Sequence, residues 1–182
     1  MADLARLGVP FALVGGLAVS VRGEVRFTRD VDLAIDVPTD LDVEALVERL
    51  RAVGYEVAAL VEHETLGRLA TVRLISRTGV IVDLLAATCG LEPEIVARAT
   101  PVEFGLNEPV PVARAEDLLA MKILSMTAGR LQDEIDARSL LSMNPGLDLQ
   151  AVRVALDTIE SRGFNRGQDL HGKLQSLLNR TG

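Results

Sequence analysis

Two strand-like segments that carry acids among apolar residues constrain the fold of this chain most. Residues 31–36 alternate between apolar and other residues, so a strand here places its apolar side chains on one face and its acids on the other. Residues 80–85 form a second apolar strand with Asp83 in its middle. A carboxylate in that position is costly to bury without a partner. The fold must therefore supply a partner for Asp83.

An acid pair stands at the beginning of the first of these strands. Asp30 and Asp32 are two residues apart, so both carboxylates project from one face, ~7 Å apart along the backbone. Such pairs are common on strand edges, and alone this one is more often solvated surface. Unpaired carboxylates side by side also repel, which raises one pKa. A divalent cation removes that conflict, and Mg²⁺ binds through a few carboxylates while it keeps positions for water and phosphate oxygens.

The three acids become a stronger signal if the two strands are neighbours. Asp83 would then complete a cluster with Asp30 and Asp32 that is able to hold two metal ions ~4 Å apart. Asp83 would lie nearest the attacking group and is the best candidate to accept its proton. We therefore predict Asp30, Asp32 and Asp83 as metal ligands and catalytic residues.

A glycine pair, Gly15-Gly16, follows the apolar run 11–14 and opens a predicted helix at residues 17–22. Glycine permits close approach of the backbone to a phosphate, and the first turn of a helix presents free N–H groups to an anion. The segment is neither a Walker A loop nor a G-x-G-x-x-G motif. We predict a cradle for nucleotide phosphates, with a tight turn required only for packing as the alternative.

The remaining pattern predicts an α+β fold, with a core at residues 1–113 and a helical region at residues 114–182 packed on it. The turn at residues 77–79 predicts an antiparallel hairpin between the strands on either side. The predicted strands are residues 11–14, 31–36, 55–60, 69–76, 80–85, 102–104 and 110–112. The predicted helices are residues 17–22, 43–53 (capped by Asp40 or Asp42), 92–98, 115–126, 131–143, 149–161 and 169–179.

Composition limits the partners. The net charge of −7 argues against broad non-specific binding to phosphate backbones, although a local basic patch stays open. Four Phe, one Tyr and no Trp leave few side chains on which bases could stack. A single cysteine, Cys89, fits a reducing compartment, and no apolar stretch has the length of a membrane span. Residues 8–21 resemble the apolar part of a signal peptide, but Asp3 offsets Arg6 and the glycine pair interrupts the run. We expect a cytoplasmic protein.

Together these residues resemble the nucleotidyltransferase superfamily that includes DNA polymerase β. The shared pattern is a glycine pair, a spacer of thirteen residues, an acid-x-acid on a strand and a later acid on another strand. The finer form, LVGGLAV, RFTRDVDLAID and VDLLAA, resembles the AbiEii and MenT toxins of type IV toxin–antitoxin systems. The resemblance covers most of residues 10–143. It implies a mixed sheet flanked by helices, with a C-terminal helical portion, and Mg²⁺-dependent transfer of a nucleoside monophosphate from an NTP to an acceptor.

The resemblance continues into the C-terminal helices. In that family a helix lysine and a following Arg-x-x-Asp-x-x-Asp stretch lie near the nucleotide, which implies that Lys122 contacts the triphosphate. The stretch corresponds to Arg130, Asp133 and Asp136. We predict that the two acids form ion pairs with Arg130 or Lys122, and that they affect the site only indirectly. A solvated helix face, or a pair with Glu116 or Asp117, is the alternative for Lys122.

Three residues just before the acid pair, Arg26, Thr28 and Arg29, are predicted to bind nucleotide phosphates. A solvated loop that balances the charge of Asp30 is the alternative for all three. His63 and His171 are isolated in the sequence and indicate neither a zinc site nor a catalytic triad.

The leading functional hypothesis is a toxin-like enzyme that acts on RNA, such as a tRNA 3′ end, or on a protein. A cognate antitoxin is then an expected partner, whereas no membrane or DNA partner is expected. An antibiotic adenylyltransferase is a second hypothesis. A catalytically silent, antitoxin-like binding module is a third, and the three intact acids argue against it. Larger members of the family carry more helices that help to engage the acceptor, so the sequence leaves the acceptor open.

Overall fold

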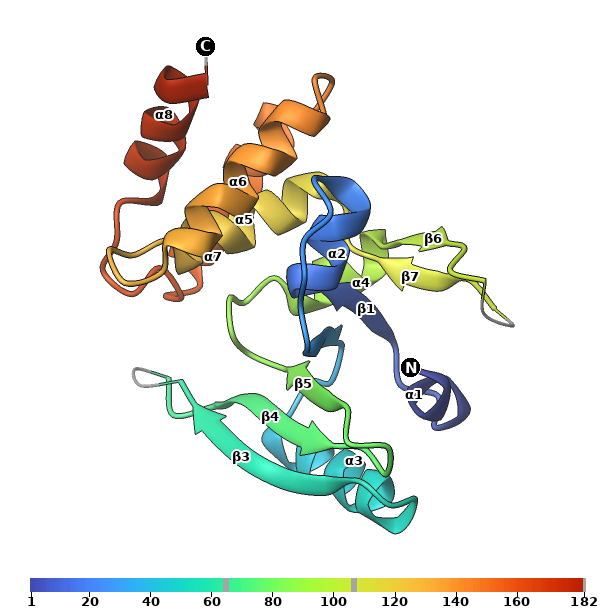
Figure 1. Ribbon diagram of the computed structural model, residues 1–182. Coiled ribbons are helices and arrows are strands. Elements are labelled where there is room, and N and C mark those ends of the chain that lie inside the picture. The colour runs from blue at the N-terminus through green and yellow to red at the C-terminus, as the bar shows by residue number, and fades with distance from the viewer. Residues whose placement is uncertain (64–65, 106–107, 182) are drawn as a thin grey trace.

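A seven-stranded mixed sheet forms the centre of the protein, seen here in a computed structural model that describes residues 1–63, 66–105 and 108–181 (Figure 1). Its strand order is β3-β4-β5-β2-β1-β7-β6. β2 pairs with β5 and β1 pairs with β7 in parallel, and the other neighbours are antiparallel. The strands are β1 (Phe11–Val14), β2 (Val31–Ile35), β3 (Glu56–Glu62), β4 (Leu69–Ile75), β5 (Ile81–Leu85), β6 (Thr100–Val102) and β7 (Val110–Val112).

Helices flank this sheet, which confirms the predicted α+β class. Helices α5, α6, α7 and α8 gather at one end of the molecule, and the β3–β4 hairpin with α3 lies at the other (Figure 1). The helices are α1 (Ala2–Arg6), α2 (Gly15–Arg22), α3 (Asp40–Ala52), α4 (Glu92–Arg98), α5 (Ala115–Ser125), α6 (Leu131–Met143), α7 (Leu149–Ser161) and α8 (Leu170–Thr181).

Two details of the predicted elements were wrong. Thr39, rather than Asp40 or Asp42, caps α3, because the helix begins three residues before its apolar pattern and Thr39 accepts a hydrogen bond from the backbone N–H of Asp42. The strand predicted at residues 102–104 lies at Thr100–Val102 instead. It is placed by pairing with β7, where Thr100 faces Val112, and this pairing is not visible in local sequence.

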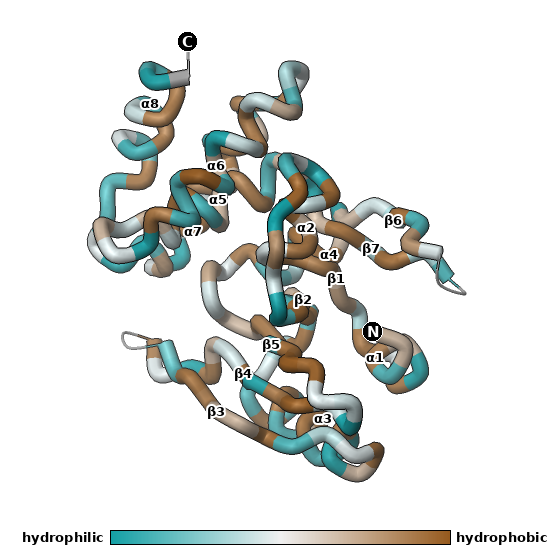
Figure 2. The backbone as a smooth tube through the Cα atoms, in the orientation of Figure 1, coloured by the Kyte–Doolittle hydropathy of each residue, from teal (hydrophilic) through white to brown (hydrophobic). Residues whose placement is uncertain are grey.

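One hydrophobic core joins the sheet to the C-terminal helices. Leu13 and Leu33 from the sheet belong to the same buried cluster as Leu119 and Ile123 from α5. Apolar residues accordingly follow both the central strands and α5 in Figure 2. The helical region therefore packs directly against the sheet, while the boundary at residue 113 stays a prediction. In the residues that the structure describes, no helix is both long and apolar enough to cross a membrane.

Phe164 ties three distant segments together. It lies in the connection between α7 and α8 and is buried. Its ring packs on Gly90, whose φ of +74° and lack of a Cβ both suit the contact, since a Cβ there would meet the ring. It also meets the ring of the buried His63 edge-on, with 4.8 Å between centroids. The tip of the β3–β4 hairpin, the segment after β5 and the C-terminal helices thus share one aromatic contact.

We predict that Phe164→Ala lowers the free energy of unfolding by about 3–5 kcal/mol, because it leaves a cavity beneath His63 and Gly90. Urea denaturation followed by circular dichroism measures the loss. Val154→Ala on α7, where Val154 is half-exposed, is the control and should change stability by no more than about 0.5 kcal/mol. Equal losses in the two variants would contradict the anchoring role of Phe164.

Candidate active site

The strand pairing brings two of the predicted acids together. In the parallel pair of β2 and β5, Asp32 lies directly opposite Asp83. Asp30 precedes β2 by one residue and lines the same cavity, which has a volume of about 630 Å³. The neighbouring position of the two strands, on which the three-acid hypothesis depended, is therefore present in the fold.

Arg73 is a central residue of the site that the sequence reasoning missed. It lies on β4 directly opposite Asp83 and donates two hydrogen bonds to that carboxylate, from Nε at 2.9 Å and from Nη2 at 2.7 Å. Nη2 also lies 3.4 Å from Asp30 Oδ2. The bonds and the charge of Asp83 raise the pKa of Arg73. The turn at residues 77–79 held the signal, because a hairpin closed there places Arg73 across from Asp83.

Asp32 is held against the glycine pair. Gly15 has a φ of +64°, and a Cβ at this position would collide with the Asp32 carboxylate. Burial raises the pKa of Asp32, and the charge of Asp83 adds to the rise. The charge of Lys122 and a hydrogen bond from the backbone N–H of Gly16 act in the opposite direction. The glycine pair therefore lets the Asp32 carboxylate approach the backbone closely. This is a role in addition to that of a tight turn needed only for packing.

The three acids form a donor set that suits a divalent ion, but in this arrangement Arg73 serves as their cation. The guanidinium lies between Asp30 and Asp83, so the three carboxylates do not converge on one point. Carboxylate oxygens are the ligands that Mg²⁺ prefers, and burial together with the charge of Asp83 raises the pKa of Asp32, so a nearby positive charge favours its ionised form. The residues therefore fit a metal site, provided that Arg73 gives way.

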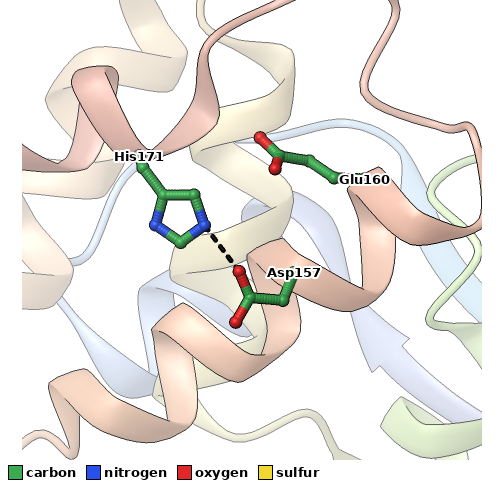
Figure 3. A group of neighbouring side chains, drawn as sticks. All are labelled: Asp157, Glu160 and His171. Carbon is green, nitrogen blue, oxygen red and sulfur yellow. Dashed lines mark hydrogen bonds and ion pairs between the residues drawn. The ribbon is translucent and has the colours of Figure 1, made fainter.

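In the described part of the chain, a different group of side chains has its potential ligand atoms close enough together to hold one metal ion. Asp157, Glu160 and His171 have ligand atoms within 4.8 Å of one another, and they lie on α7 and α8 away from the cavity (Figure 3). His171 Nε2 is 2.8 Å from Asp157 Oδ1. His171 therefore has a close acidic neighbour, although it is isolated in the sequence. Packing of α8 on α7 creates this contact, which we interpret as an exposed hydrogen bond between the two helices.

Lys122 is fixed by the two acids of α6. Its Nζ lies 2.8 Å from Asp133 Oδ1 and 2.7 Å from Asp136 Oδ2, and Arg130 Nε lies 2.8 Å from Asp133 Oδ2. The predicted ion pairs are thus present. Glu116 and Asp117, the alternative partners of Lys122, pair instead with arginines of their own. Lys122 also lines the cavity, so its ammonium is held at the wall by α6.

Asp136 links that group to the segment before the acid pair. It is 1% exposed, and Arg26 approaches it with Nε 2.8 Å from Oδ1 and Nη2 3.0 Å from Oδ2. Gln132 Nε2 donates to Oδ1 at 2.8 Å. Burial alone would raise the pKa of Asp136, but the hydrogen bonds and charges of Lys122, Gln132 and Arg26 lower it. Arg26 lines the cavity and holds Asp136 at the same time.

The other predicted phosphate contacts differ in position. Thr28 lines the cavity, whereas Arg29 does not and lies 5.9 Å from the centroid of the exposed Phe27 ring. Arg166, from the connection between α7 and α8, is a second cavity residue that the sequence reasoning missed. Arg166 lies in a turn more than eighty positions after Asp83. No local pattern in the sequence marks such a residue as part of the site, so Arg166 could not be predicted from the sequence.

A mixed sheet with a glycine pair opening a helix, acids on two adjacent parallel strands and a helix lysine at the same cavity defines a nucleotidyltransferase of the polymerase-β type. The chain belongs to the family of AbiEii nucleotidyltransferase toxins of type IV toxin–antitoxin systems, whose model matches residues 1–180. Nucleotidyltransferases of this family generally use an NTP and a divalent metal ion. No curated protein shows significant sequence similarity to the chain.

A solved structure agrees with the chain in fold. The chain is similar to an antigenic nucleotidyltransferase-like protein from Paracoccidioides brasiliensis, at 22% identity and a TM-score of 0.50, over 98% of this chain and 88% of that one. It is also similar to the lincosamide antibiotic adenylyltransferase LnuA (16% identity, TM-score 0.48, 77% and 90% covered). A further match is the antibiotic-resistance factor ANT(2'')-Ia (20% identity, TM-score 0.49, 88% and 87% covered).

We predict that Arg73→Gln tightens the binding of Mn²⁺ in the absence of nucleotide by roughly tenfold, because it removes a cation that competes for Asp83 and Asp30. Isothermal titration or the electron paramagnetic resonance of free Mn²⁺ measures the affinity. Arg77→Gln, in the exposed turn of the same hairpin, makes the same change of charge and should leave the affinity unchanged. Equal or weaker binding by Arg73→Gln would contradict the competition.

We predict that Asp136→Asn lowers the free energy of unfolding by about 3 kcal/mol at pH 7, because Lys122 and Arg26 lose a buried partner. The pKa of Asp136 is lowered in the folded protein, so its stabilisation is present above the ordinary pKa and is lost as the pH falls through the folded value. The difference from wild type should therefore shrink below about pH 4. Urea denaturation across pH measures it, with the exposed Asp157→Asn as a control expected to change little.

Proposed function

We propose that the protein transfers a nucleoside monophosphate from an NTP to a hydroxyl of an acceptor and releases pyrophosphate. The observation that carries this proposal is the pairing of Asp32 with Asp83 beside the glycine pair that opens α2. Acids on adjacent strands and free N–H groups at a helix start are what a metal-bound triphosphate requires. Asp30, Asp32 and Asp83 would hold two Mg²⁺ ions, which supply charge neutralisation on the phosphates and activation of the attacking hydroxyl.

The residues of the chain then have separate tasks. The first turn of α2 binds phosphate oxygens through backbone N–H groups, and Lys122 presents its ammonium to the triphosphate from α5. The acceptor oxygen bonds to the α-phosphorus while the bond from that phosphorus to the β-phosphate oxygen breaks. The hydroxyl proton passes to the Asp83 carboxylate, and pyrophosphate leaves. Positioning and charge stabilisation supply most of the catalysis in such transfers.

The proposed setting is that of a toxin in the cytoplasm. Membership of the AbiEii family supports a toxin of a type IV toxin–antitoxin system. We propose a cognate antitoxin as its partner, and RNA, such as a tRNA 3′ end, or a protein as the acceptor. A silent binding module would not need the three acids, the lysine and the glycine pair at one cavity. Their presence together favours the enzyme.

The transfer is tested by incubating the protein with Mg²⁺ and each α-labelled NTP, with total RNA, total protein and an aminoglycoside as separate acceptors. We predict that Asp32→Asn and Asp83→Asn each reduce the rate of labelling on the order of 10³-fold, because a metal ligand is lost. Asp36→Asn is the matched control, since Asp36 is exposed at the far end of the same strand and should not change the rate. Equal labelling by wild type and Asp32→Asn would overturn the catalytic proposal.

A further inference from the structure

The sheet order divides the cavity into two ends on either side of the acids. Gly15 and Gly16 follow β1, Asp32 lies on β2, Asp83 on β5 and Arg73 on β4, and these strands are neighbours in that order. The end beyond Asp83 is lined by Thr71 and Arg73 of β4, by Thr88 after β5, and by Arg166 from the connection between α7 and α8. The phosphate-binding glycine pair and this second end therefore lie on opposite sides of the acids.

Arg166 is unlike the other cations of the cavity. Arg26, Arg73, Lys122 and Arg130 each pair with a carboxylate, whereas Arg166 has no carboxylate partner among the described residues. Its Nη2 donates to the backbone carbonyl of Thr88 at 3.0 Å, a contact that leaves the positive charge uncompensated.

The surroundings of Arg166 add to this imbalance. Lys173 lies close enough that, after the effect of burial, the charge of Arg166 lowers the pKa of Lys173. Arg166 also has a φ of +54° and is the sole non-glycine residue with positive φ in the described chain. Strained backbone of this kind persists where the surroundings enforce it and is concentrated at functional sites. An exposed cation is thus held at the cavity wall by a costly backbone conformation and lacks an anion.

We propose that Arg166 forms an anion-binding subsite for the acceptor, where it binds the RNA phosphodiester that precedes the attacking 3′ hydroxyl. This inference rests on the proposed function. In an in-line transfer the attacking and leaving oxygens lie on opposite sides of the phosphorus. With pyrophosphate at the glycine pair, the attacking hydroxyl approaches from the end that holds Arg73 and Arg166. A guanidinium offers two parallel donors that match phosphate oxygens.

The charge of this end also discriminates between acceptors. The unpaired charge of Arg166 attracts a phosphodiester and opposes a polycation such as an aminoglycoside at this end of the cavity. Arg73 is a poor residue for testing this, because it also contacts two of the metal-binding acids. Arg166 is exposed and forms no hydrogen bond or ion pair with the predicted metal ligands, so its substitution separates acceptor binding from metal binding.

The test uses Arg166→Asn, because asparagine tolerates a positive φ. The probe is a short single-stranded RNA with a 3′ hydroxyl and a 5′ fluorophore, with a second RNA in which the last phosphodiester is an uncharged methylphosphonate. Anisotropy measures the affinity of both RNAs, and a fluorescent NTP analogue with Mg²⁺ measures nucleotide affinity. Arg51→Asn on α3, an exposed arginine paired with Glu48, makes a similar change of charge and is the control.

We expect Arg166→Asn to weaken the native RNA roughly tenfold and to leave nucleotide affinity unchanged, while Arg51→Asn changes neither. The methylphosphonate should weaken binding to wild type by a similar factor but add little in Arg166→Asn, because both changes remove the same contact. The subsite would be overturned by unaltered RNA binding, by a loss of nucleotide affinity, or by additive losses of RNA affinity from the variant and the methylphosphonate.

Faster transfer to the aminoglycoside tobramycin by Arg166→Asn with unaltered RNA binding would overturn the subsite in favour of a polycationic acceptor. Absence of label transfer by wild type to any acceptor would refute the proposed function and not the subsite, which the binding measurements decide independently.

Discussion

The parallel pairing of β2 with β5 imposes the electrostatic problem around which the site is built. It places the carboxylates of Asp32 and Asp83 on adjacent strands in a partly buried position, where like charges raise a pKa and oppose folding. Compensation comes from three directions: the N–H of Gly16 on α2, the ammonium of Lys122 on α5, and the guanidinium of Arg73 on β4. A metal ion would complete the same task. The site therefore holds two like charges side by side, and α2, α5 and β4 each supply a group that offsets them.

The position of Lys122 explains how the C-terminal helices are joined to the cavity that holds the three acids. A lysine has four flexible bonds and would not by itself hold its ammonium at a cavity wall. Asp133 and Asp136 fix it from α6, and Arg26 holds Asp136 from the segment that leads to the acid pair. This chain of ion pairs connects α5, α6 and the segment before β2. Because α5 also shares the hydrophobic core with the sheet, packing and charge align the helices with the acids.

The sequence was sufficient to predict the elements whose pattern is local. The alternation in β2, the hairpin of β4 and β5, and helices α6 and α7 depend on short-range periodicity, and all lie where predicted. The three acids and the glycine pair were found because their residue types are unusual on apolar strands. Arg73 and Arg166 were missed for different reasons. The first required counting the hairpin register across the turn, whereas the second depends on how the α7–α8 connection folds back over Thr88, which only tertiary packing determines.

The acidity of the chain is compatible with an RNA acceptor when the charges are considered by location. A net charge of −7 repels phosphate backbones at long range and removes the broad attraction on which non-specific binding depends. Affinity must then come from a few close contacts. The other cations of the cavity already pair with carboxylates, which leaves Arg166 as the unmatched one among the described residues. Under the proposed subsite, one unmatched arginine at the exposed wall of the cavity favours a flexible RNA end that can enter the cavity over a duplex that binds along a surface.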